Sequence, residues 1–157
     1  MSQFFSIHPE NPELRLIRRA AEIIVQGGVI VFPTDSLYAL GCNIGDKAAK
    51  ERIQKMRDLD ERHEFTLLCP NLSSLATYAK VDNIAYRILR QLTPGPYTFV
   101  LPATSEVPKR LVHPNRKTIG IRVPSNPIAH QLLRELRQPL MSVTFSLCDE
   151  EDEVTLL

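Results

Sequence analysis

Residues 27–41 read Gly-Gly-Val-Ile-Val-Phe-Pro-Thr-Asp-Ser-Leu-Tyr-Ala-Leu-Gly, a short apolar run that stops at a proline and is followed at once by polar side chains. The glycine pair is typical of a helix end, and residues 29–32 are typical of a strand buried on both faces. Pro33 has no backbone N–H to donate to a neighbouring strand. Residues 34–36 therefore follow the carboxyl end of a strand, where ligands bind in open α/β sheets. A strand followed by a plain Asp/Ser turn explains the same residues equally well.

The length and composition are typical of one domain with its own core. The chain has 157 residues, of which 43% are apolar, and no change in composition marks a linker. We expect a single domain over residues 1–148. The sequence shows neither a secretion signal nor an apolar run near the roughly 20 residues that a membrane span needs, so we expect a cytoplasmic protein without a membrane partner.

Cysteine and histidine spacing gives no sign of a metal site. Cys42, Cys69 and Cys148 are odd in number and far apart, and none forms a Cys-x-x-Cys motif. The four histidines also lack the spacing of metal ligands. We therefore expect neither a disulfide framework nor a bound metal in the protein itself.

The charge is unevenly distributed along the chain. The net charge is +1, but residues 149–153 are all acidic, and the chain before them has 19 basic and 13 acidic residues, a net charge of +6. A moderately basic body suits a phosphate-bearing partner, either a nucleotide or a nucleic acid. We expect residues 149–157 to be a disordered acidic tail, or else to fold back over a basic cleft.

Helical and strand-like segments alternate along the chain. Asn11 and Pro12 have the pattern of an N-cap and a first helical residue, and this amphipathic helix would end at Gly27. Asp46 would cap a second helix that ends near Arg57. Further strands are predicted at 65–68, 97–101, 118–123 and 140–145, and further helices at 72–78, 83–92 and 126–137. About five strands interleaved with helices predict an α/β fold with a mixed sheet.

Four motifs follow one another in order. They are Gly-Gly-x-x-x-x-Pro-Thr-Asp-Ser-x-Tyr-x-Leu-Gly at 27–41, Lys-x-Arg at 55–57, Pro-Gly-Pro-x-Thr at 94–98 and Arg-x-Pro at 122–124. Together they resemble the YrdC family of threonylcarbamoyl-AMP synthases, and the pattern is most similar to its YciO branch. The resemblance covers roughly residues 7–147. The chain is shorter than the family at its C-terminal end, so we expect a sheet edge that a dimer partner or the tail would cover.

The resemblance implies a twisted α/β sheet with helices packed on it and a basic, concave face. It also implies an enzyme that joins L-threonine, bicarbonate and ATP into threonylcarbamoyl-AMP and releases pyrophosphate, in the pathway that makes threonylcarbamoyladenosine in tRNA. ATP would be a substrate and Mg²⁺ would accompany its triphosphate. Chemistry of this kind needs positioned hydroxyl groups and cations more than covalent help from the protein.

The resemblance assigns roles to seven residues. Thr34 would contact threonine, Arg122 would pair with the threonine carboxylate, and Ser142 would line the same cleft. Four others would face the phosphates of a nucleotide or of RNA: Lys55, Arg57, Thr118 and Thr144. Each has a plainer explanation, since the Lys-x-Arg pair suits a helix C-terminus, the threonines favour strands, and Arg122 could pair with a carboxylate such as Asp35.

Two segments depart from the synthase pattern. Synthases carry Ser-Ala-Asn and then Ser-Gly after the last matched strand, whereas residues 142–147 read Ser-Val-Thr-Phe-Ser-Leu. Residues 58–65 also contain carboxylates beside the expected triphosphate, which would oppose binding unless they hold Mg²⁺ or face away. Two alternatives therefore stay open: a binding protein for double-stranded RNA or tRNA that has lost catalysis, and a shortened relic with neither activity.

Overall fold

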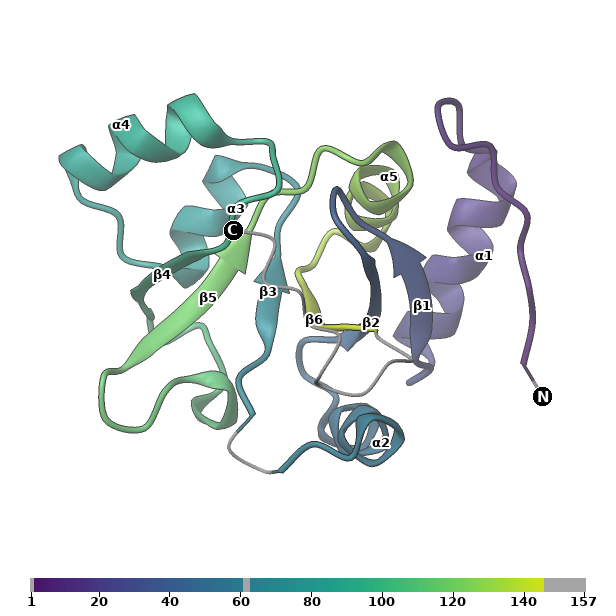
Figure 1. Cartoon of the computed structure of the whole chain (residues 1–157), viewed down its shortest axis with the longest axis horizontal. Coiled ribbons are helices and arrows are strands. Elements are labelled where there is room, and N and C mark those ends of the chain that lie inside the picture. The colour runs from purple at the N-terminus through teal and green to yellow at the C-terminus, as the bar shows by residue number, and fades with distance from the viewer. Residues whose placement is uncertain (1, 61–62, 146–157) are drawn as a thin grey trace.

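Figure 1 shows the computed structural model, in which helices flank one sheet; the structure describes residues 2–60 and 63–145. The strands are β1 (Ile30–Pro33), β2 (Tyr38–Asn43), β3 (Thr66–Leu68), β4 (Phe99–Pro102), β5 (Thr118–Arg122) and β6 (Leu140–Thr144). Their order across the sheet is β1-β2-β6-β3-β5-β4, with β3 and β5 parallel and the other neighbours antiparallel. The prediction of an α/β fold with a mixed sheet is confirmed.

The expected number of about five strands is too low, because residues 38–43 also form a strand. This segment contains Gly41 and no β-branched side chain, so its own preference for a strand is weak. It is held in place by β1 on one side and β6 on the other. Residues 34–37 are therefore the turn of a β1–β2 hairpin.

Five α-helices and one 3₁₀ turn complete the described fold. They are α1 (Leu14–Val25), α2 (Lys47–Arg57), α3 (Leu72–Tyr78), α4 (Asn83–Leu92), α5 (Pro127–Leu136) and the 3₁₀ turn η1 (Lys109–Leu111). Four of the helices begin after a side chain that accepts a backbone N–H of the first turn, namely Asp46, Asn71, Asp82 and Asn126. These caps are local features, and the sequence placed a helix start at each of the four residues, as the structure does.

The predicted start of the first helix is wrong by two residues. Nδ1 of His8 accepts the backbone N–H groups of Glu10 and Asn11 at 3.2 and 3.0 Å, so Asn11 belongs to a turn before the helix. The N-cap position is Glu13. Its carboxylate accepts the backbone N–H of His8 at 3.0 Å, which ties this turn to the helix start.

One face of the sheet packs against α2, α3 and α4. Leu67 and Ile121 of the sheet belong to the same apolar cluster as Ile53, Leu75 and Leu89 of these helices, and all five side chains are buried. This cluster is the larger of the two cores among the described residues.

The opposite face is covered by α1 and α5 over part of its width. Phe32, Ala39 and Leu140 of the sheet pack there with Ile24 of α1 and Leu133 of α5. In Figure 1 these two helices lie on the side of the molecule that holds β1 and β2, away from β4 and β5. The β3, β5 and β4 part of this face carries no member of either core beyond Leu68.

The cysteines and the helix lengths relate to the expectations about disulfide bonds and membrane spans. Cys42 and Cys69 are free and fully buried, and burial raises the pKa of each thiol to about 12. Cys148 and the expected acidic tail at 149–157 lie outside the described residues. Among the helices of the described ranges, none is both long enough and apolar enough to cross a lipid bilayer.

Candidate functional site

A row of small and polar residues crosses the uncovered part of the second face. Ser142 pairs with Gly41 on one side and with Thr66 on the other, and Thr66 pairs with Gly120. Gly120 pairs in turn with Val100 of the edge strand, whose side chain is 62% exposed. Residues that pair directly across strands point to the same face of a sheet. The row therefore forms a floor with little side-chain bulk on it.

Three of the predicted site residues lie on the same face beside this row. Side chains alternate along a strand, so Thr118 and Arg122, two residues either side of Gly120, share its face, and Thr144 shares the face of Ser142. Thr144 is exposed, while Ser142 is buried and its hydroxyl donates to the carbonyl of Thr66 at 3.2 Å. The sheet thus places Thr118, Arg122, Ser142 and Thr144 on one face.

Thr34 lies in the β1–β2 turn, where its side chain stabilises the local backbone. Its hydroxyl donates to the carbonyl of Leu37, and its oxygen accepts the backbone N–H of Ser36 at 3.3 Å. The next residue, Asp35, accepts the backbone N–H and the hydroxyl of Ser125 at 2.8 and 2.9 Å and also the backbone N–H of Asn126. These bonds tie the turn that carries Thr34 to the start of α5.

Arg122 is the least satisfied polar side chain among the described residues. Its Nε and Nη2 atoms are shielded from solvent and have no hydrogen-bond partner there. Burial lowers the pKa of the guanidinium below its ordinary value, and the negative charge of Asp35 partly opposes that shift. The two side chains form no ion pair within the described residues, because the Asp35 carboxylate is directed to Ser125 and Asn126. A half-buried guanidinium with two shielded, unpartnered donors is poised to bind an anion.

The Lys-x-Arg pair is divided by the structure. Arg57 is half-buried at the end of α2, and its Nε donates to the carbonyl of Thr144 at 3.1 Å, so it reaches the end of β6. Lys55 is exposed on α2, which packs on the opposite face of the sheet. No hydrogen bond or ion pair in the described part of the chain connects Lys55 to the row.

The Pro-Gly-Pro-x-Thr segment lies at the other side of the row. The backbone N–H of Gly95 donates to the carbonyl of Val123 at 2.9 Å, immediately after Arg122. The methyl group of Thr98 lies 3.5 Å from the position that a Cβ atom on Gly120 would occupy. The segment therefore forms a wall beside β5.

The structure adds functional candidates that the seven assigned residues did not include. Thr66 is hidden in an apolar run of the sequence, and Gly120 interrupts an alternating strand, so only the register places them on the floor. Asp35 was visible in the first motif, but its partner Ser125 gave no sequence signal.

The His, Cys, Asp and Glu side chains of the described residues do not cluster as the ligands of a metal site would. Within residues 2–60 and 63–145 there is no group of three or more His, Cys, Asp or Glu side chains that could hold a metal ion. The described side chains therefore offer no cage of three such ligands, and we derive no step from a bound Mg²⁺.

Comparison with known proteins identifies the family of this chain. A family model that covers Sua5, YciO and YrdC, described as telomere recombination, matches residues 22–155. The chain belongs to the Sua5/YciO/YrdC family. YciO of Escherichia coli K12 is 58% identical over 151 residues, which are 96% of this chain and 73% of that protein. A threonylcarbamoyl-AMP synthase of Nitrosococcus oceani is 36% identical over 129 residues, which are 82% and 69% of the two chains.

Solved structures of the Sua5/YciO/YrdC family have the same fold. The crystal structure of E. coli YciO matches with a TM-score of 0.91, over 96% of this chain and 73% of that chain, at 58% identity. The structure of P. abyssi Sua5 complexed with L-threonine matches with a TM-score of 0.79, over 85% and 39% of the two chains, at 29% identity. The predicted family and the predicted sheet with packed helices are confirmed.

Proposed function

We propose that this protein binds L-threonine at the uncovered face and converts it with bicarbonate and ATP into threonylcarbamoyl-AMP. The observation that carries the proposal is Arg122, whose Nε and Nη2 are buried without a partner at the edge of a floor of hydroxyl groups. A guanidinium offers parallel N–H donors that match a carboxylate. The threonine carboxylate would supply the acceptors that the described residues lack.

Asp35 makes this assignment more specific. It is the nearby carboxylate that would otherwise neutralise Arg122, but it accepts three hydrogen bonds from Ser125 and Asn126 instead. Arg122 is thus left to a ligand while the surrounding backbone is fixed. The arrangement is preorganised, because no group of the protein must be displaced from the guanidinium when the carboxylate arrives.

The hydroxyl groups of the site suit the rest of the reaction. The threonine amine would add to bicarbonate with loss of water, and an oxygen of the resulting carbamate would attack the α-phosphorus of ATP while pyrophosphate leaves. Thr144 is exposed at one end of the row, and Arg57 reaches its carbonyl from α2. These residues, with Thr118, would face the phosphates, where fixed positive charge stabilises the leaving pyrophosphate.

The chain lacks the asparagine of the Ser-Ala-Asn motif, and this difference is compatible with an enzyme slower than the synthases that carry it. Thr144 occupies the position of the asparagine in the Ser-Ala-Asn motif of the synthases, and its hydroxyl both donates and accepts a hydrogen bond. A hydroxyl is shorter than an amide and makes one donor contact where an amide makes two. We expect a weaker hold on the nucleotide, and threonine binding that does not depend on this position.

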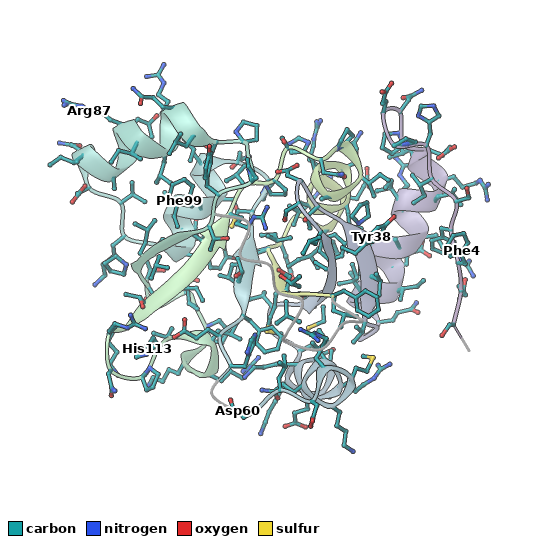
Figure 2. The ribbon with its side chains drawn as sticks, in the orientation of Figure 1. Phe4, Tyr38, Asp60, Arg87, Phe99 and His113 are labelled. Atoms are coloured by element: carbon teal, nitrogen blue, oxygen red, sulfur yellow. The ribbon has the colours of Figure 1, made fainter. Side chains whose placement is uncertain are left out.

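Two assays test the proposal. Threonine is expected to raise the melting temperature of the wild-type protein, and to promote pyrophosphate release from ATP in the presence of bicarbonate. Arg122→Met should abolish both responses. Arg87→Gln is the matched control, because Arg87 is an exposed arginine on α4 that Figure 2 shows far from the β1–β2 hairpin. No threonine-dependent response in the wild-type protein would exclude the proposal.

Lys55 favours a second candidate, a non-catalytic protein for double-stranded RNA or tRNA. Its side chain is exposed and has no hydrogen bond or ion pair to the row within the described residues. An ammonium group in this position is better placed for a phosphate of a nucleic-acid backbone than for a nucleotide bound on the row. Binding through phosphates weakens steeply with salt. If this candidate is right, Lys55→Gln will reduce the affinity for RNA and the salt dependence together, while threonine will have no effect on the melting temperature.

A further inference from the structure

A pocket separate from the threonine site opens between the start of β3 and the loop that leads into β5. It has a volume of about 610 Å³ and is lined by residues 63–65 and 109–115. None of the seven assigned residues lines it. Figure 2 shows His113 on this loop, at the margin of the sheet. A pocket of this size is within the range that holds a small-molecule ligand.

The floor of the pocket is apolar. Phe65 and Leu111 belong to the core on the covered face of the sheet, and both are buried. The ring of His63 meets that of Phe65 edge to face, with centroids 6.4 Å apart and planes at 87°. An exposed imidazole beside apolar side chains offers a surface on which a flat ring can pack.

The wall of the pocket is held by an internal hydrogen-bond network. Nδ1 of His113 accepts the backbone N–H groups of Asn115 and Arg116 at 3.2 and 3.0 Å. Its Nε2 lies 3.5 Å from the Glu64 carboxylate, which also lies 3.8 Å from Nη2 of Arg116. Glu64 is therefore already engaged by positive or donor groups of the wall.

The rim carries two cations that have no acidic partner in the described ranges. Lys109 and Arg110 are exposed, and neither forms an ion pair there. Nη2 of Arg110 donates to the backbone carbonyl of Ile44 at 3.5 Å. With Glu64 occupied by the wall, the positive charge of the rim is available to an anion.

We propose that this pocket binds a nucleotide, with its phosphate at Lys109 and Arg110 and its base against the exposed ring of His63. The combination of an apolar floor, an aromatic edge and adjacent cations matches a ligand that has one flat, apolar end and one doubly charged end. Both wall contacts of Glu64 involve its Oε1 atom, so Oε2, together with the side-chain amide of Asn115, offers acceptors to base or ribose donors. The site does not depend on threonine binding at Arg122, since the two sites share no residue.

Calorimetric titration with AMP tests the assignment. We expect AMP to bind the wild-type protein, and Lys109→Gln/Arg110→Gln to weaken binding at least tenfold. Lys47→Gln is the matched surface control, because Lys47 is exposed on α2 and its one ion pair within residues 2–60 and 63–145 is with Glu51 at 3.9 Å. Arg122→Met should leave AMP affinity at this pocket unchanged. Loss of AMP binding in the Arg122 variant with full binding in the double variant would overturn the proposal, as would no binding of AMP to the wild-type protein at millimolar concentration.

A second readout does not rely on the variants being folded. In the wild-type protein, AMP should shift the imidazole proton resonances of His63 and His113 in NMR spectra, and leave those of His8 and His130 unmoved. A short oligoribonucleotide with a terminal phosphate distinguishes the source of the nucleotide. Tighter binding than AMP, still lost in the double variant, identifies the end of an RNA strand, whereas equal or weaker binding identifies a free nucleotide. Unchanged His63 and His113 resonances with either ligand would rule the pocket out.

Discussion

The Asp35 carboxylate accepts both the backbone N–H and the hydroxyl of Ser125, at 2.8 and 2.9 Å, although the two residues are 90 positions apart in the sequence. This contact joins the β1–β2 turn to the first turn of α5. It has two consequences for the site. The turn that carries Thr34 is held in one place, and Arg122 loses the carboxylate that would have neutralised it.

Asp35→Ala should destabilise the protein and weaken threonine binding together. Hydrogen bonds to a charged group contribute about 1.5–3 kcal/mol, and this carboxylate accepts several, so we expect the free energy of unfolding to fall by at least about 2 kcal/mol. Urea denaturation measures the fall. Ser125→Ala is the graded control, because it removes one hydroxyl bond and keeps the backbone ones, with an expected loss of about 1 kcal/mol. Equal losses in the two variants would mean that the carboxylate does not hold the turn.

Arg122→Met should make the free protein more stable while it removes the response to threonine. An unpartnered buried donor costs about 1–3 kcal/mol, and more when it is charged, so an apolar side chain of similar length should raise the free energy of unfolding by about 1 kcal/mol or more. Denaturation without ligand, compared with melting in saturating threonine, separates the two effects. Arg122→Lys keeps the charge but loses the forked donors, and should restore little of the response. A variant less stable than the wild type would show that Arg122 has a structural partner.

The local parts of this fold were predictable from the sequence, and the long-range parts were not. The strand that stops at Pro33 and the caps at Asp46 and Asn126 depend on neighbouring residues, and the structure contains all three. The strand at 38–43 depends on pairing with β1 on one side and, on the other, with β6 about a hundred residues later, because its composition favours no strand.

The residues of the candidate site likewise fall into those that the sequence could place and those that only the tertiary structure places. Ser142, Thr144, Thr118 and Arg122 could be placed on strands from the sequence and from the resemblance, and the sheet puts them on one face. Thr66 could not be found, since a threonine in an apolar run gives no sign of its face until the register is known. The separation of Lys55 from Arg57 follows from how α2 ends against β6, which is again a tertiary contact.

Gly120→Ala should preserve stability and still reduce ligand binding. A Cβ atom on Gly120 would lie 3.5 Å from the Thr98 methyl group and 3.6 Å from the Thr66 hydroxyl, which are ordinary van der Waals distances. Replacing a glycine without strain stabilises a protein by about 0.4–1 kcal/mol through the unfolded chain. The added methyl group would however occupy the floor of the row, so the threonine-dependent rise in melting temperature should shrink.

Gly45→Ala is the matched control for that prediction. A Cβ atom on Gly45 would have no heavy atom within 4 Å, and this position lies just before α2, away from the row. Both variants should therefore be folded and equally stable, and only Gly120→Ala should lose the response. Unchanged threonine binding in Gly120→Ala would mean that the ligand does not lie on the row.

The two buried thiols predict a loss of stability at alkaline pH. The pKa of Cys42 and of Cys69 is raised to about 12, chiefly because burial disfavours the thiolate, whereas an unfolded thiol has a pKa of about 8.5. Between these values the folded state binds more protons than the unfolded state, so the free energy of unfolding falls as the pH rises. Each thiol contributes a slope of up to about 1.4 kcal/mol per pH unit within that window, and none below it.

Denaturation series from pH 8 to pH 11 measure this slope. The pKa of Tyr78 is also raised by burial and acts in the same direction, so the wild-type slope alone does not isolate the thiols. The double variant Cys42→Ala/Cys69→Ala provides the comparison, and its stability should decrease less steeply with pH than that of the wild type. Peptide mapping after treatment with iodoacetamide at pH 8 gives an independent check, because Cys42 and Cys69 should be modified only as fast as the protein opens. Identical slopes in the two proteins, or rapid modification of both thiols in the folded state, would show that the cysteines are not held in the core as described.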